Sequence, residues 1–159
     1  MNSLDDVYRK FGEASEAAQL LETELGTVLL EHQAGEAGLF LGGRGEEAAA
    51  LLEAINSSTL GTLLRRVEGK EPRLAPSAEV MARALAYRNR LAHSFFRQHN
   101  FRRNTPEGCA IMLADLEAIH QTILAAYKVA LALSSIDLDA FASRERPGGD
   151  VPTKHLKLK

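Results

Sequence analysis

The sequence predicts an all-α protein, an antiparallel bundle of four to five helices. Three observations support this fold class. Apolar residues recur at helical spacing along most of the chain, glycine and proline fall mainly between these periodic segments, and no segment alternates for long enough to form a strand. The chain has 159 residues, 45% of them hydrophobic and 25% charged, which suits one domain with a single core.

The first predicted helix begins near Leu4 and ends near Gly35. Its apolar residues alternate in spacing between three and four positions over four heptads, which is typical of a helix face buried against other helices. These residues are Leu4, Val7, Phe11, Ala14, Ala18, Leu21, Leu25 and Val28. Ser3 is the expected N-cap, because Asp5 and Asp6 follow it in the first turn. The long stripe offers more apolar surface than one small bundle needs, which favours a homodimer.

Glycine and serine interrupt the next part of the chain. Residues 38–45 (GLFLGGRG) predict a glycine-rich loop, and residues 46–55 predict a short helix rich in alanine, leucine and glutamate. The polar segment 56–58 (NSS) ends that helix, and one of its two serines can cap a further short helix that runs to about Glu68.

Two longer helices complete the predicted bundle. Ser77 is the expected cap of a helix that runs through Phe95, and residues 100–105 form a polar, basic loop after it. Pro106 suits the first turn of the last helix, which continues to about Phe141.

The composition changes after the last helix. Residues 143–159 contain two prolines, two glycines and five lysines or arginines. We therefore predict a helical-bundle domain at residues 1–142, followed by a flexible basic tail at residues 143–159.

Several classes of protein are disfavoured by simple features of the chain. Cys109 is the only cysteine, so neither an intrachain disulfide nor a cysteine-based metal site can form. Asp5, Asp6 and Glu13 lie where a signal peptide needs a basic start, and no stretch approaches the roughly 18 uncharged apolar residues of a membrane span. The histidines show no metal-ligand spacing, and His99 is expected in a solvated loop. We expect a cytoplasmic protein with no metal, cofactor or membrane partner.

Charge is distributed unevenly along the chain. Residues 80–106 contain six arginines and no acidic residue, although the whole chain has a net charge of −2. The six are Arg83, Arg88, Arg90, Arg97, Arg102 and Arg103. The guanidinium group suits phosphate oxygens, so this segment predicts a surface for a polyanion such as RNA. Alternatively, the arginines pair across the bundle with acids of the first helix. Those acids are Glu13, Glu16, Glu22 and Glu24.

The most informative segment is RNRLAH, residues 88–93. On a helix, Asn89 and Arg90 share a face with His93, because they lie four and three positions before it. Arg88 lies about 140° away from His93 around a helix that turns ~100° per residue. Arg88 and His93 can therefore converge only if long side chains reach around, if the helix bends, or if a second subunit supplies one of them.

This segment resembles the Arg-X4–6-His signature of the HEPN superfamily, including the polar residue directly after the arginine. HEPN proteins are small helical bundles, often dimeric, and many are metal-independent endoribonucleases of toxin–antitoxin or phage-defence systems. The resemblance implies Arg88, Asn89 and His93 as catalytic residues and a cognate antitoxin as a partner. The other arginines of the segment would then bind the RNA. They are Arg83, Arg90, Arg97, Arg102 and Arg103.

The chemistry that the resemblance implies suits these side chains. The ribose 2′-hydroxyl attacks the adjacent phosphate, His93 takes or gives a proton, and Arg88 stabilises the charge on the non-bridging oxygens. Asn89 orients His93 or hydrogen-bonds a phosphate. The products are a 2′,3′-cyclic phosphate and a 5′-hydroxyl end.

One position departs from part of the family. HEPN toxins that are neutralised by transfer of AMP carry a tyrosine two residues after the histidine, and Phe95 occupies that place here. Neutralisation by that route is not expected. The alternative function is a non-catalytic helical module, a regulator or antitoxin-like adaptor that binds RNA, nucleotide or an acidic protein. Burial of both Arg88 and His93 against glutamates of the first helix would exclude the enzyme.

Overall fold

The computed structural model describes residues 2–36 and 45–134. Within these residues it contains six α-helices, two short 3-10 helices and no strand, so the predicted all-α bundle is confirmed. The predicted loop lies outside the described residues except for Gly45, as do residues 135–142 of the predicted domain and the predicted tail at 143–159.

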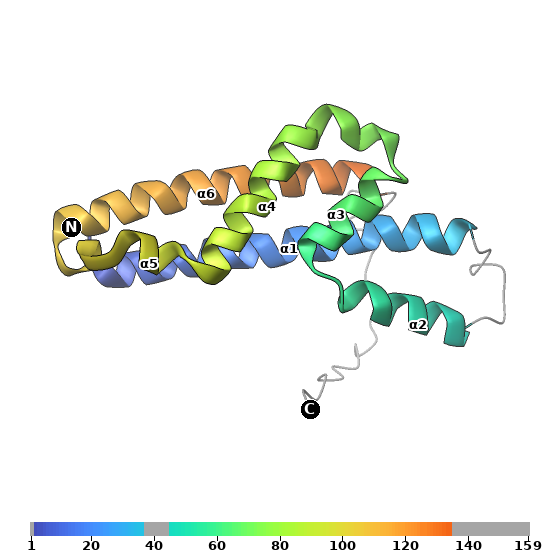
Figure 1. The fold of residues 1–159 in the computed structure, drawn as a ribbon, viewed down its shortest axis with the longest axis horizontal. Helices are drawn as coiled ribbons and strands as arrows, with labels where there is room; N and C mark the ends of the chain where they lie inside the picture. Colours follow the sequence, from blue (N-terminus) through green and yellow to red (C-terminus); the bar gives the residue numbers. More distant parts are fainter. Residues whose placement is uncertain (1, 37–44, 135–159) are drawn as a thin grey trace, which may run out of the picture.

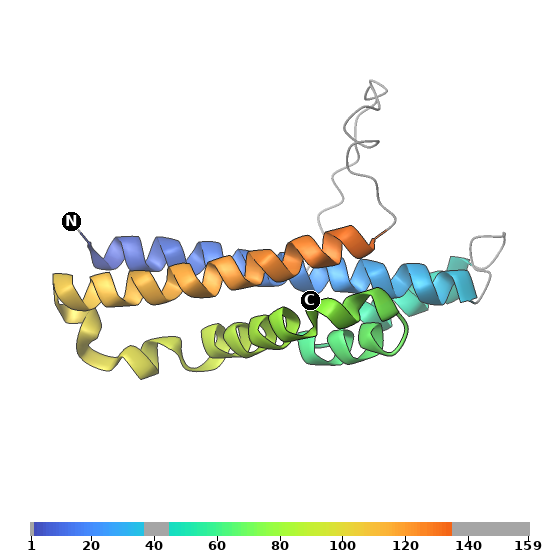
Figure 2. The same ribbon diagram turned by 90° about the horizontal axis from the view of Figure 1, so that it is seen from above.

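The two longest helices of the bundle, α1 (Leu4–Glu36) and α6 (Pro106–Leu133), pack against each other. They lie side by side and run in the same direction, while α4 (Ala78–His93) runs the opposite way (Figures 1 and 2). An ion pair between Lys10 and Glu117 near the start of α1 fits this parallel register. The expected antiparallel arrangement therefore holds for α4 against its neighbours but not for the two longest helices.

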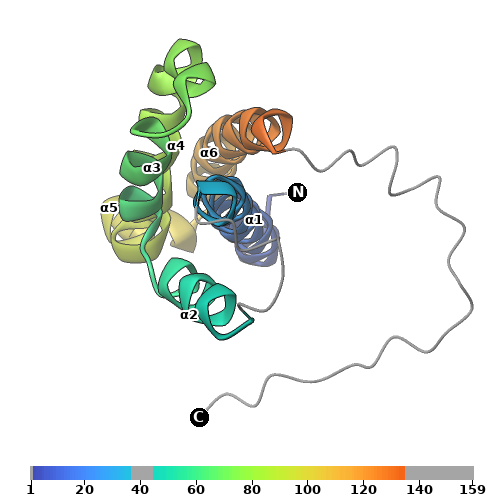
Figure 3. The ribbon, with the colours of Figure 1, turned by 90° about the vertical axis from the view of Figure 1, so that its right-hand side faces the viewer.

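The apolar stripe of α1 is buried within this chain. Val7, Ala14, Leu21 and Leu25 are at most 1% exposed, and α1 lies among α2, α3, α4 and α6 when the bundle is viewed end-on (Figure 3). Only Leu4 and Phe11 of the predicted stripe are partly buried rather than fully buried. The stripe is thus used by intrachain packing and no longer supports a dimer.

The buried face of α6 supplies the other half of the core. Its residues Met112, Leu116, Ile119 and Ile123 are fully buried, and Cys109 is 3% exposed. By length and composition α6 is also apolar enough to cross a membrane, which the sequence analysis did not expect of any segment. Its apolar face packs into the core, and 33% of its most apolar 18-residue window is buried in the bundle.

The shorter helices α2 (Gly45–Asn56) and α3 (Leu60–Glu68) agree with the predicted segments, but the cap of α3 is Thr59. The Thr59 hydroxyl accepts a hydrogen bond from the backbone N–H of Thr62. Ser57 and Ser58, which were predicted to cap this helix, donate instead to the carbonyl of Ala54 at 3.1 and 2.8 Å. Both serines follow the last turn of α2 and satisfy one of its free carbonyls.

A 3-10 helix, η2 (Pro72–Ser77), leads into α4, and its start joins three elements. Glu71 is 3% exposed and accepts hydrogen bonds from the guanidinium of Arg73. Its Oε2 also lies 3.0 Å from Nε2 of His32 on α1. Arg73 also donates to the carbonyl of Leu133 at the end of α6, at 3.0 Å. Ser77 occupies the cap position of α4 as predicted, although its side chain makes no capping hydrogen bond.

Candidate functional site

Arg88 lies on the side of α4 that faces α1. Its Nη2 is 2.8 Å from Oε1 of Glu22, and both side chains are about one quarter exposed, at 27% and 26%. Glu22 Oε1 accepts no hydrogen bond, so Arg88 and Glu22 form an ion pair without a hydrogen bond between them. Arg88 Nη1 also donates to Asn89 Oδ1 at 3.2 Å. The structure therefore joins Arg88 to Asn89 and to an acid of the first helix.

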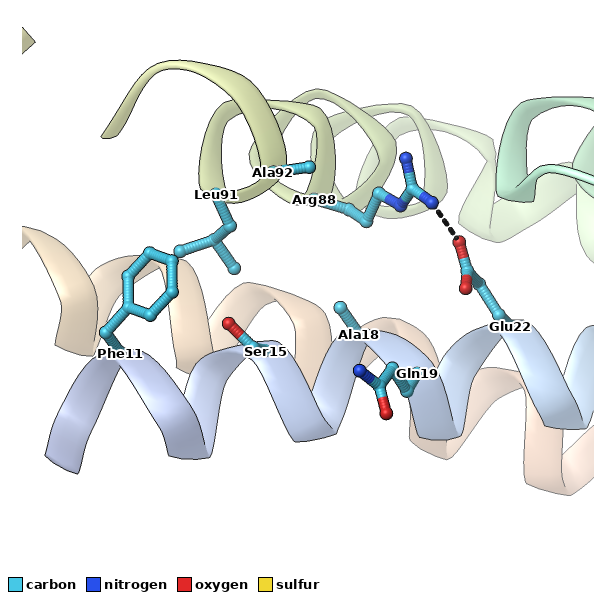
Figure 4. Close-up of a pocket in the computed structure, with 8 residues that line it drawn as sticks. All are labelled: Phe11, Ser15, Ala18, Gln19, Glu22, Arg88, Leu91 and Ala92. Atoms are coloured by element: carbon cyan, nitrogen blue, oxygen red, sulfur yellow. Dashed lines mark ion pairs between the residues drawn. The ribbon is translucent and has the colours of Figure 1, made fainter. Parts of the chain in front are cut away.

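Arg88 and Glu22 close one end of a groove between α1 and α4 (Figure 4). The groove has a volume of about 370 Å³. It is lined by Phe11, Ser15, Ala18, Gln19, Glu22, Arg88, Leu91 and Ala92. One end is apolar, at Phe11 and Leu91, and the other carries the ion pair (Figure 4). A phosphate entering this groove would meet the guanidinium of Arg88 and compete with Glu22 for it.

His93 is the last residue of α4 and is exposed. Its ring does not line the groove, and the imidazole makes no hydrogen bond, ion pair or ring contact with a described residue. Its backbone carbonyl accepts a hydrogen bond from Arg97 Nη2 at 3.3 Å. A single chain therefore does not bring Arg88 and His93 together, as their angular separation on the helix requires.

The helix that was predicted to run through Phe95 is interrupted at Ser94. Ser94 has φ −144° and ψ −7°, and a short helix α5 (Phe95–His99) follows in a new direction. The bend places the Phe95 ring in the core, 5.7 Å from the ring of Phe11. Because the bend follows His93, it does not bring Arg88 closer to His93.

Arg90 belongs to a second polar cluster, which the sequence analysis did not predict. Its Nη1 and Nη2 bind the two carboxylate oxygens of Asp115 at 2.8 and 2.5 Å, and its Nε donates to Gln98. The guanidinium carbon also lies 5.6 Å from the centroid of the Phe95 ring. Burial raises the pKa of Asp115, but hydrogen bonds from Arg90 and His99 outweigh it and leave this pKa below its ordinary value. Arg90 is therefore occupied within the chain.

His99 is 4% exposed, in contrast to the solvated loop position that was predicted. Its Nδ1 lies 3.1 Å from Arg102 Nη1, and its Nε2 lies 2.6 Å from Asp115 Oδ2. A guanidinium can only donate hydrogen bonds, so Nδ1 of His99 accepts one from Arg102. Nε2 therefore carries the ring proton and donates a hydrogen bond to Asp115. No local spacing in the sequence could have found this pair, because the ring and the carboxylate come from α5 and α6.

The six arginines of residues 80–106 divide into two groups. Three pair with acids of the same chain: Arg83 with Glu79 at 2.6 Å, Arg88 with Glu22, and Arg90 with Asp115. The other three are exposed and have no acidic partner among the described residues. These are Arg97, Arg102 and Arg103. Glu22 is the one acid of the first helix that pairs with this group among the described residues, so the predicted pairing across the bundle applies to Arg88 alone.

Comparisons with known proteins add no relative to this picture. No family model, no curated protein and no solved structure matches the chain. Among residues 2–36 and 45–134, no group of three or more histidine, cysteine, aspartate or glutamate side chains is placed to hold a metal ion.

Proposed function

We propose that this protein is a HEPN-type, metal-independent endoribonuclease that works as a homodimer in the cytoplasm. The supporting observation is the state of the three candidate side chains. His93 is exposed at a helix end, its ring has no hydrogen-bond or ion-pair partner among the described residues, and Arg88 donates a hydrogen bond to Asn89 at an open groove. An exposed imidazole is free to move protons, and a partly exposed guanidinium can receive a phosphate.

A second copy of the chain completes the site in this proposal. Arg88 and His93 of one chain lie on different sides of α4, and no contact joins them. In this proposal the second copy brings its own His93 to the open groove that holds Arg88. The dimer is therefore proposed because the site is incomplete without it, and no longer because of the apolar stripe on the first helix.

The reaction needs only groups that the chain and the RNA possess. The 2′-hydroxyl of the substrate gives its proton to His93 and attacks the neighbouring phosphorus, and the bond to the 5′-oxygen of the next nucleotide breaks. That oxygen takes up a proton from the imidazolium so formed or from water, and leaves as a 5′-hydroxyl. Arg88 stabilises the charge that develops on the non-bridging oxygens, with Asn89 holding its guanidinium. Entry of the phosphate replaces the carboxylate of Glu22 as the partner of Arg88.

The decisive experiment incubates wild-type protein with total RNA in EDTA beside the His93→Ala and Arg88→Ala variants. Arg65→Ala is the control, since Arg65 is an exposed arginine on α3, outside residues 80–106, that donates to the carbonyl of Gly61. We expect cleavage by the wild type and the control, with cyclic-phosphate ends, and none by the two site variants. No cleavage by folded wild type, or equal cleavage by all four proteins, would refute the assignment. Growth arrest on expression of the wild type, and not of His93→Ala, tests a toxin role with a cognate antitoxin.

A second candidate function is favoured by the ion pair between Arg88 and Glu22. A guanidinium already held by a carboxylate is a structural contact between α1 and α4. In this case the protein is a non-catalytic module that binds RNA, nucleotide or an acidic protein through its remaining arginines. Retained RNA binding without any cleavage by the wild type would identify this function.

A further inference from the structure

The 3-10 helix η3 (Asn100–Asn104) connects α5 to α6 (Figure 1) and carries an exposed aromatic side chain. Phe101 is 75% exposed, more than any other large hydrophobic residue that the structure describes. Arg102 and Arg103 follow it directly, and both are exposed. Residues 94–106 contain no aspartate or glutamate, and the next acid along the chain is Glu107 in the first turn of α6.

The backbone of η3 is firmly packed. A Cβ atom at Gly108 would lie 1.9 Å from the carbonyl oxygen of Arg102, so only glycine allows η3 to approach α6 this closely. Thr105 caps α6 by accepting from the N–H of Gly108 at 3.0 Å. The guanidinium of Arg102 is fixed to the buried ring of His99. Phe101 is therefore exposed on a turn that is held in place on both sides.

The turn also contains an unusual backbone conformation. Asn100 has φ 48°, the one positive φ among the described residues other than glycine. Asparagine tolerates positive φ better than most residues, but the conformation is still strained. Because the Phe101 ring is exposed, it adds no burial to the core that could offset the strain of this turn. We take this as a sign that the ring contacts a binding partner.

Single-stranded nucleic acid fits the chemistry of this surface. Proteins that bind single strands combine aromatic rings, on which bases stack, with arginines that contact the phosphates. Here Arg102 and Arg103 directly follow Phe101 in the same turn, and Arg97 lies on the adjoining α5. None of these three guanidinium groups is neutralised by a described acid. A single ring among cations offers a stacking surface but little apolar area for insertion into a membrane.

We propose that Phe101 is a stacking platform for an unpaired base of single-stranded RNA, with Arg97, Arg102 and Arg103 binding the adjoining phosphates. This inference rests on the proposed function, since it names the form of RNA that the protein takes and a residue that holds it. It assigns a role to Phe101, on which the sequence analysis was silent. It also separates substrate binding at η3 from the chemistry at α4.

The test measures binding of a fluorescently labelled oligouridylate to His93→Ala protein in EDTA, so that the probe stays intact. Phe101→Ala in this background is expected to weaken binding about tenfold, because stacking of one base contributes on that order. Phe101→Trp, which keeps an aromatic ring at this position, is expected to bind the oligouridylate as tightly as the parent protein. Ile111→Ala is the matched control, since Ile111 is a 50% exposed apolar residue on α6 outside the basic turn. Arg103→Ala is expected to weaken binding of all sequences and to reduce its salt dependence.

Several outcomes would overturn the proposal. The first is that the oligouridylate does not bind, or that Phe101→Ala and the Ile111→Ala control bind it with equal affinity. The second is that the protein binds an RNA duplex as tightly as the single strand. The third is that Phe101→Ala changes only the binding to phosphatidylglycerol vesicles or only dimerisation. Because Phe101 is exposed, unchanged melting of Phe101→Ala verifies the fold. Failure of the ribonuclease is seen separately: loss of affinity in Phe101→Ala without any cleavage by wild type supports the platform and refutes the enzyme.

Discussion

Glu71 is the residue whose removal tests the packing of the fold most directly. Its side chain is 4% exposed and joins α1, η2 and the end of α6 through His32 and Arg73. Hydrogen bonds from Arg73 outweigh the effect of burial and lower the pKa of Glu71 from 4.5 to about 2. We predict that Glu71→Gln destabilises the protein at neutral pH.

The size of the effect follows from the pKa of Glu71. A change from 4.5 to about 2 corresponds to about 3 kcal/mol of stability at pH 7. Arg73 is 64% exposed and stays solvated when its partner is lost, so we expect a smaller loss, about 2 kcal/mol. Because the folded state lowers this pKa, the stabilisation is complete above the ordinary value of 4.5 and is lost as the pH falls through about 2. Less than half of it remains at pH 3.

The assay is urea denaturation of wild type and Glu71→Gln at pH 7 and at pH 3. Glu68→Gln is the control, because Glu68 is exposed on α3 and such substitutions usually change stability by less than about 0.5 kcal/mol. We expect a clear difference in the free energy of unfolding at pH 7 that shrinks at pH 3. A difference that is the same at both pH values, or one no larger than that of the control at pH 7, would refute the reasoning.

Three other substitutions test the site and its support. Glu22→Gln removes the charge opposite its arginine partner and is expected to tighten RNA binding by up to about fivefold, since such pairs contribute roughly 0.2–1 kcal/mol; unchanged or weaker binding in fluorescence anisotropy contradicts this. Asp115→Asn leaves the guanidinium and imidazole of its cluster without their anion and is expected to lower the free energy of unfolding at pH 7 by about 2 kcal/mol; wild-type stability in urea contradicts it. Gly108→Ala displaces the carbonyl of Arg102 and is expected to lower Tm by about 5 °C. Gly12→Ala, where a Cβ meets nothing within 4 Å, is its control, and an equal Tm for the two variants argues against a fixed η3.

The positions of the helices could be predicted from sequence because they depend on local pattern. The stripe on α1 predicts which face is buried, and Pro106 marks the start of α6. Burial of Cys109 agrees with the apolar face on which it lies. The direction of α6 relative to α1 could not be predicted, because periodicity reports which side of a helix is apolar and not which helix covers it.

The sequence predicted the residues of the candidate site on α4 but not the residues that pair with them. Residues 88–93 carry the Arg-His pattern, but its partners come from distant segments: Glu22 on α1 for Arg88, and Asp115 on α6 for Arg90. Long side chains make such pairs between elements that no spacing rule connects. The break at Ser94 was missed because the core contact of Phe95 decides it, and local propensity does not.

The sequence by itself thus determined the helical content, the main helix boundaries and the concentration of arginines between residues 80 and 106. Only the tertiary structure decided which of those arginines remain available, namely Arg97, Arg102 and Arg103. It also decided that His99 is buried, which a polar ring tolerates here because both nitrogens have partners. The physical reason is that charge pairing and polar burial depend on distances between helices, and these distances exist only once the core has packed.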